Sequence, residues 1–365
     1  FYANGSLYRQ DAGGMDSSIK TEDSPSFTAD RDDFEKIDGL INAGMRREKW
    51  DANITFKRAY QYTEIDDGAY KDDENSYLEF DRTLWQYSGR YRFSPSLDIQ
   101  VIGSFSNSER FFEDDSSRVS ASQWDHTIST GTYYGRLQTH EAQLTYQRKA
   151  FEAIAGVGLY HEKMFFENHI LVKDPAFPFE LVTNYDTIDT RTTTSYAFGR
   201  ARYTHNRFSI SAGGRLSNHT ESGTFGTFEV NPSYVVDGYL IYASLSTGFN
   251  PPSLYQLFDP SRTYIAFATR GNADLKPEIS LSYEVGVKKE FSSGSYITLS
   301  GYQTTVRDGI EYVYLWNGER TLDELDFSDD RGDRYINIGE LETRGLELEG
   351  MIHLSEHFSL TGNFS

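Results

Sequence analysis

The sequence contains no cysteine among its 365 residues, and this absence removes two kinds of site from consideration. Without cysteine there is neither a disulfide framework nor a thiolate metal centre. The sequence also lacks any run of about 18 consecutive apolar residues, which excludes a transmembrane helix. It begins at Phe1 with no methionine and no signal peptide. We therefore expect the chain to be a fragment or a mature segment.

Positive charge is scarce as well. Lys and Arg number 35 against 55 Asp and Glu, which gives a formal net charge of −20. Because nucleic acids require a basic face, we predict no nucleic-acid partner. Apolar residues at sustained helical spacing are also missing, so helices are a minor part of the fold. Aromatic residues, in contrast, are abundant: 26 Tyr and 25 Phe occur in a chain whose mean hydropathy is −0.60.

Apolar residues occupy alternate positions in several stretches of the chain. The clearest are 239–249, 281–291 and 207–216, and the same pattern recurs at 97–105 and 346–354. A period of two predicts strands with one apolar face and one polar face.

The connections between strand-like stretches alternate between short and long. Short polar turns are expected at 48–51, 94–96, 149–150, 205–207, 236–238, 292–295 and 355–357. Long segments are expected at 13–33, 64–76, 107–130, 166–190, 219–226, 249–276 and 316–333. Hairpins that are tight at one end and long at the other are typical of outer-membrane barrels, and the pattern predicts about 15 strands.

A soluble β-sandwich or propeller is the alternative for such a pattern. Two features favour the membrane barrel. Several expected strands run to roughly 10–16 residues, whereas soluble strands usually have about five or six. Tyr and Phe also gather near strand ends, for example at Tyr60, Tyr91 and Phe165, as the aromatic girdles of a barrel do. We predict an all-β fold, a transmembrane antiparallel β-barrel.

The negative charge is concentrated in four of the long segments. Residues 13–33 carry six acids and two bases, 64–76 six and one, 107–130 five and two, and 323–334 six and two. Two explanations account for this charge: the acidic residues keep exposed loops solvated, or their carboxylates bind calcium. No EF-hand spacing occurs, so calcium is an expectation without named ligands and the metal ligands stay unknown.

Three motifs occur in order in the last third of the chain: STGFNPPSLYQLF at 246–258, GNADLKPEIS at 271–280, and YINIG at 335–339 with RGLELEG at 344–350. Together they resemble the C-terminal barrel of TonB-dependent outer-membrane receptors. The residues that match the family pattern are Gly248, Phe249, Pro252, Leu254, Leu257, Gly271, Asn272, Leu275, Pro277, Glu278, Glu284, Asn337, Gly339, Gly345 and Glu347.

The resemblance implies a barrel of about 22 strands around an N-terminal plug. Residues 1–365 would then be a partial barrel domain of about 15 strands with the plug outside this chain. It further implies a monomeric barrel in the outer membrane of a Gram-negative bacterium, surrounded by lipopolysaccharide and lipid. A TonB-type energy-coupling protein would act through the plug, and the chain would not be an enzyme.

The expected cargo is a large, scarce nutrient bound by extracellular loops. Aromatic side chains there can stack on a flat ligand, and the candidates are Tyr255, Phe258, Tyr264 and Phe267, with Trp124 and Trp316 behind them. Cobalamin is the best prediction, and a ferric siderophore is the alternative. Haem is less favoured because no His lies between 250 and 275.

Two other classes remain open alternatives. A passive porin would share the strand pattern but have no plug. A barrel protease or lipase would need grouped catalytic side chains, whereas the His residues are scattered and the HExxH and GxSxG motifs are absent.

Overall fold

The computed structural model of the protein describes residues 1–14, 31–66, 75–115, 127–173, 180–261, 269–292, 294–316 and 330–365. Strands dominate these residues, and the helix α1 (Leu254–Phe258) is short. The strands are β1 (Tyr2–Ala12), β2 (Phe34–Arg46), β3 (Trp50–Glu64), β4 (Ser76–Ser94), β5 (Leu97–Asp115), β6 (Thr127–Arg148), β7 (Phe151–Lys173), β8 (Glu180–His205), β9 (Phe208–His219), β10 (Gly223–Val236), β11 (Tyr239–Asn250), β12 (Glu278–Glu290), β13 (Tyr296–Arg307), β14 (Ile310–Trp316), β15 (Asp330–Asn337), β16 (Glu340–Ser355) and β17 (Phe358–Phe364).

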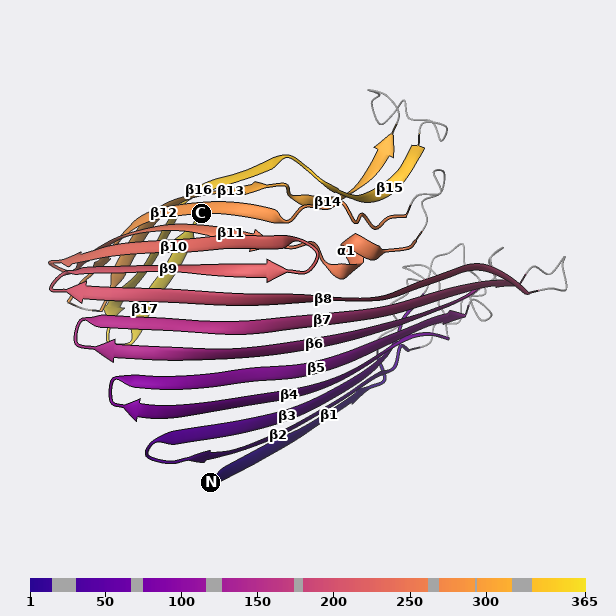
Figure 1. Cartoon of the computed structure of the whole chain (residues 1–365), viewed down its shortest axis with the longest axis horizontal. Helices are drawn as coiled ribbons and strands as arrows, with labels where there is room; N and C mark the ends of the chain where they lie inside the picture. The colour runs from indigo at the N-terminus through magenta and orange to yellow at the C-terminus, as the bar shows by residue number, and fades with distance from the viewer. Residues whose placement is uncertain are drawn as a thin grey trace. The chain divides into compact units, whose positions relative to one another are not determined.

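Fifteen strands form one sheet in the order β1 to β13, then β16 and β17 (Figure 1). Strands that follow one another in sequence pair antiparallel, as β1 with β2 and β11 with β12 do. The prediction of an all-β antiparallel fold is confirmed, and the main sheet has the expected number of strands. The remaining pair, β14 and β15, forms a separate two-stranded ribbon that the sequence did not predict. The chain leaves the sheet after β13 at Asp308, where φ is 55°.

All seven predicted short turns are present. They join the strand pairs β2/β3, β4/β5, β6/β7, β8/β9, β10/β11, β12/β13 and β16/β17. Several use a left-handed residue, as tight hairpin turns require. Lys149, Asn206 and Asp237 have φ values of 52°, 51° and 50°, and Gly238 follows Asp237 with φ 80°.

Three of the predicted long segments are wrong in extent. Strand β5 continues to Asp115 and β6 begins at Thr127, so much of 107–130 is strand. Likewise β7 and β8 extend through most of 166–190, and β9 and β10 leave only residues 220–222 between them. Beyond the bilayer a strand needs no alternating apolar side chains, because backbone pairing alone continues it. The hydrophobic pattern therefore ends before the strand does.

The contacts divide the chain into two units, and each strand from β4 to β8 contributes to both. The first unit comprises residues 1–91, 101–140 and 160–193, and the second comprises residues 92–100, 141–159 and 194–365. Strands β9 to β17, which include the motif-bearing strands β11, β12, β15 and β16, lie wholly in the second unit.

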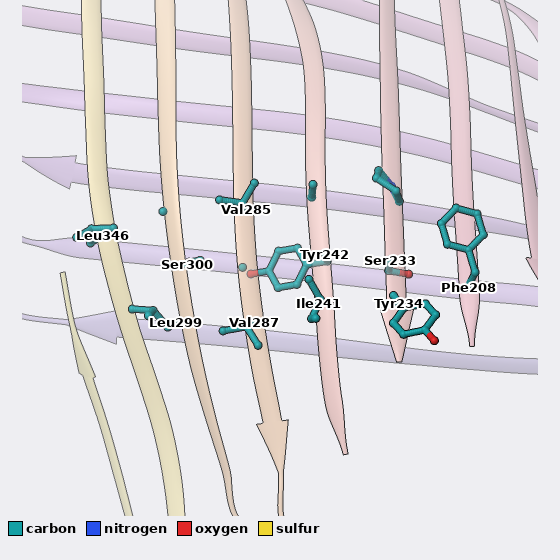
Figure 2. A pocket seen from close by; sticks show the side chains of 14 residues that line it. Phe208, Ser233, Tyr234, Ile241, Tyr242, Val285, Val287, Leu299, Ser300 and Leu346 are labelled. Carbon is teal, nitrogen blue, oxygen red and sulfur yellow. The ribbon is translucent and has the colours of Figure 1, made fainter. Parts of the chain in front are cut away.

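Within the second unit, the two faces of the sheet differ in chemistry. Ile241 pairs with Val287, and Val287 pairs with Leu299, on a face that stays open (Figure 2). Ile241 is 50% exposed and Val285 is 62% exposed. On the opposite face Tyr242 donates a hydrogen bond to Glu284 at 2.9 Å. An open apolar face opposite a polar one is the pattern of a membrane barrel wall and argues against the soluble sandwich. No helix within the described ranges is long and apolar enough to cross a bilayer.

Candidate functional site

The first motif folds into α1 at the long-loop end of β11. Pro251 and Pro252 follow the last residue of β11 and end the strand, because they have no N–H to donate. Ser253 caps the helix: its hydroxyl accepts from the Gln256 N–H, and the Gln256 side chain accepts from the Ser253 N–H. This reciprocal capping box stabilises a helix that is otherwise too short to persist.

Leu254 and Leu257 point inward from α1 and are only 2% and 5% exposed. Spacing of three residues places them on one side of the helix. Their burial fixes α1 against the protein, so the motif leucines are structural side chains.

The second motif passes close to the end of α1. The Gly271 N–H donates to the Asp259 carbonyl at 3.0 Å, and the Asn272 N–H donates to the Gln256 carbonyl at 2.9 Å. A Cβ at position 271 would lie 2.4 Å from the Asp259 backbone nitrogen. Glycine is required at this position because the two backbones approach too closely for any side chain.

The third motif joins these segments to the β14–β15 ribbon. Asn337 accepts from the Lys276 N–H at 2.8 Å, and its amide group donates to the Lys276 carbonyl at 2.9 Å and to the Asp308 carbonyl at 2.7 Å. The Asn272 amide donates to the Tyr335 carbonyl at 2.9 Å. We call α1, residues 269–277 and the β14–β15 ribbon the loop anchor.

Glu278 completes the loop anchor where β12 begins. One carboxylate oxygen accepts from the Ile310 N–H at 2.9 Å and the other from the Asn250 amide at 2.8 Å. The Gly339 carbonyl accepts from the Asp308 N–H at 3.0 Å. Three motifs separated in sequence therefore meet in one hydrogen-bonded assembly, and their polar residues bind the backbone of neighbouring segments.

An ion pair that sequence reasoning missed lies inside the loop anchor. Arg270 Nε contacts Asp333 Oδ2 at 2.8 Å, and the Asp333 side chain is 9% exposed. The Tyr312 hydroxyl also donates to Asp333. In the sequence, Asp333 is only one of the six acidic residues of segment 323–334. Its burial depends on the pairing of β14 with β15, which no local pattern indicates.

Tyrosine rings pack around this ion pair. The Tyr335 ring lies 5.1 Å from the Tyr312 ring and 6.4 Å from the Tyr255 ring, the latter edge-on at 82°. Burial and the Asp259 carboxylate raise the pKa of Tyr335, and Arg270 partly opposes the rise. The hydroxyl therefore stays protonated at neutral pH.

The loop anchor contains three of the six residues predicted to contact ligand, namely Tyr255, Phe258 and Trp316. Tyr255 and Phe258 are half-buried on α1, and the Tyr255 ring contacts the ribbon through Tyr335. Trp316 ends β14, but its side chain lies outside the described residues, as do Tyr264, Phe267 and Trp124 entirely. Ligand contact for all six stays a prediction.

The remaining motif residues lie on the strands. Phe249, beside Gly248, stacks on Phe225 with ring centroids 4.2 Å apart. Gly345 leaves room for the Tyr302 side chain, because a Cβ at position 345 would lie 2.8 Å from the Tyr302 hydroxyl oxygen. Glu284 holds the Tyr242 hydroxyl, and Glu347 lies two positions after Gly345 on the same polar face.

An open groove of about 600 Å³ crosses β9 to β16, and Figure 2 shows its lining. The labelled aliphatic side chains Ile241, Val285, Leu299 and Leu346 belong to the apolar face. We exclude the groove as a nutrient site because that face contacts lipid in a membrane barrel.

Metal-binding groups are not evident in the described part of the chain, where no three His, Asp or Glu side chains gather to hold an ion. Most of the acidic segments expected to bind calcium fall on residues 15–30, 67–74, 116–126 and 317–329, outside the described residues. Calcium binding stays a prediction.

Long antiparallel strands, tight turns at one end and an open apolar face define a class of protein, the outer-membrane β-barrel. The family model described as "TonB dependent receptor-like, beta-barrel" matches residues 26–365, and the chain belongs to that family. The predicted resemblance and the outer-membrane location are thereby confirmed.

Several solved structures share this fold. The copper transporter OprC is 14% identical with a TM-score of 0.72, over 98% of this chain and 55% of that one. The ferric yersiniabactin uptake receptor FyuA from Yersinia pestis is 15% identical with a TM-score of 0.65, over 98% and 55%. The siderophore receptor PirA from Acinetobacter baumannii is 13% identical with a TM-score of 0.65, over 99% and 56%. The chain spans about half the length of these proteins, and at such identity the similarity shows the fold alone.

Proposed function

We propose that this chain is the barrel part of an active-transport receptor that takes up a large, metal-bearing nutrient across the outer membrane. The match of the TonB-dependent receptor barrel over residues 26–365 carries the proposal. In this role the protein binds and translocates its cargo without covalent chemistry, and a TonB-type protein supplies the energy. Lipopolysaccharide and outer-membrane lipid surround a barrel that acts as a monomer.

The loop anchor supports this role by what it does mechanically. It ties α1 and the ribbon to the ends of β11, β12 and β13 through hydrogen bonds between side chains and backbone groups and between backbone groups themselves. Tyr255 and Phe258, two of the predicted ligand contacts, are thereby held on a fixed helix. Preorganised loops lower the entropy lost when a ligand binds.

Two metal-bearing ligands fit the proposal, cobalamin and a ferric siderophore. The sequence favoured cobalamin, while similar structures include proteins named for siderophores and for copper. Calorimetric titration of the full-length receptor in detergent with each ligand tests the proposal. Saturable binding of one of them is expected. Absence of binding for both, with a passive flux of small solutes instead, would favour the porin.

A further inference from the structure

A row of cations crosses the polar face of β2 to β5, and we call Lys36, Lys57, Arg82 and Arg110 the basic stripe. All four belong to the first contact unit. On β3 and β4, Lys57 pairs with Leu84, and Ala59 pairs with Arg82. Directly paired residues point to the same face, so the stripe is continuous from strand to strand.

The stripe lies on the inner face of the wall. On β5 and β6 the same side carries the hydrogen-bonded pairs Ser104–Thr139 and Gln100–Gln143. The opposite side carries Tyr87 and Phe105, whose rings lie 6.4 Å apart. In a membrane barrel the polar side of each strand faces the interior.

The stripe also lies toward the long-loop ends of its strands. Arg82 and Arg110 are about a dozen residues from the short turn between β4 and β5, whereas a tilted strand crosses the bilayer core in roughly 9–11 residues. Both guanidinium groups therefore face the interior outside the bilayer core, where an incoming ligand first enters.

Two hollows open along the stripe. One of about 260 Å³ is lined by Lys36, Lys57 and Arg82, and the other, of about 410 Å³, by Arg82, Arg110 and Glu162. Phe80 and Arg82 line both. Tyr133 and Tyr160 add aromatic surface to the larger hollow.

The cations are held but largely unneutralised. Arg82 Nε donates to the buried Ser106 hydroxyl at 3.3 Å, which leaves its two terminal nitrogens available. Arg110 lies 5.2 Å from the centre of the Tyr133 ring. Across the described ranges, no carboxylate forms an ion pair with Lys57, Arg82 or Arg110.

Two acids share the stripe's surroundings. Asp38 pairs with Lys36 at 3.5 Å, and Glu162 lines the larger hollow. The four cations exceed these two acids in a chain whose net charge is −20. A local excess of positive charge on an inner wall concentrates anions.

We propose that the basic stripe binds the anionic donor groups of an aromatic metal chelate, such as a ferric complex of catecholate type. Guanidinium groups form charge-assisted, bidentate hydrogen bonds to paired oxygen anions, and the Phe80, Tyr133 and Tyr160 rings offer apolar surface to the ligand's aryl rings. This inference rests on the proposed function and narrows its ligand. Cyanocobalamin carries no net charge, so it would gain little from the stripe.

The test uses the full-length receptor in detergent and three probes: the Fe³⁺ complex of a synthetic hexadentate tricatecholate, a neutral ferric trihydroxamate, and cyanocobalamin. The double variant R82Q/R110Q should bind the tricatecholate at least about tenfold more weakly, because each lost charge-assisted bond contributes about 1.5–3 kcal/mol. Its affinity for either neutral probe should change by less than about twofold.

Two single variants sharpen the test. R58Q is the matched control, because Arg58 bonds Asp81 on the opposite face of β3 and β4 and lines neither hollow, so tricatecholate binding should be unchanged. E162Q removes an acid from the larger hollow and should strengthen tricatecholate binding. Affinity of the unsubstituted receptor for the tricatecholate should fall as salt is raised.

The outcomes separate this inference from the function on which it rests. Preferential binding of a neutral probe, or equal losses in R82Q/R110Q and R58Q, would overturn the anion site and leave the receptor function standing. Failure of the folded receptor to bind any of the three probes would count against both.

Discussion

The Asn337 side chain makes three hydrogen bonds to backbone groups of Lys276 and Asp308, and its replacement by alanine should loosen the loop anchor. A typical hydrogen bond contributes about 1 kcal/mol, and water can partly replace these because Asn337 is half-buried. Local opening should therefore become easier by about 2–3 kcal/mol. That is roughly a 30- to 150-fold change in the opening equilibrium.

Hydrogen exchange of the full-length receptor measures this change directly. Protection should fall at the Lys276 amide, which loses its acceptor, and at the Tyr335 amide, which donates to the Arg270 carbonyl across the loop anchor. N218A is the control, because the Asn218 side chain makes one exposed hydrogen bond, to Thr224. Unchanged protection at both amides in N337A would refute the role assigned to Asn337.

Three further predictions follow from single contacts. G271A should disrupt the segment joining α1 to β12, because its Cβ would meet the Asp259 backbone, and should make this segment susceptible to limited proteolysis. G226A, which has open space around its Cβ, should resist proteolysis as the parent does. Burial lowers the pKa of His219, and Glu221 opposes this shift. The neutral ring accepts hydrogen bonds from the Glu221 and Ser222 N–H groups, and the stability that it contributes is lost as pH falls below about 6.5. Hydrogen exchange in residues 219–222, corrected for intrinsic rates, should therefore speed up at pH 5 in the parent, and an equal response in H219Q would contradict this. V285R places a charge on the lipid-facing side of β12 and should lower the free energy of unfolding in a bilayer by about 2–4 kcal/mol. Its barrel assembly, measured by heat-modifiable gel mobility, should be impaired, whereas T298R on the inner face should assemble normally.

The hairpin pattern was the most predictable part of the fold. Alternating residues between Tyr239 and Phe249 indicated β11, and all seven tight turns occur where polar residues interrupt the alternation. These signals are local, so one sequence suffices to read them. The outer halves of β6 to β8 were missed because polar side chains can continue a strand wherever backbone pairing does.

The loop anchor shows the limit of local patterns. The three motifs were recognised from the sequence, and their aromatic residues suggested ligand contact near Tyr255. In the structure, however, Asn272, Glu278 and Asn337 bind backbone groups about 30 to 60 residues away in sequence. The Arg270–Asp333 ion pair and the basic stripe have the same origin. Both features bring together residues from different segments, and the pairing of those segments cannot be read from one sequence.

Uptake in the native cell tests most simply whether this receptor is energy-coupled. Cells with the gene deleted and then restored would be given the radiolabelled ferric tricatecholate and cyanocobalamin in turn, with and without a protonophore. We expect accumulation of one ligand that requires the gene and stops when the proton gradient is collapsed. Gene-dependent uptake of a ligand that continues unchanged without the gradient would show passive passage and contradict an energy-coupled receptor.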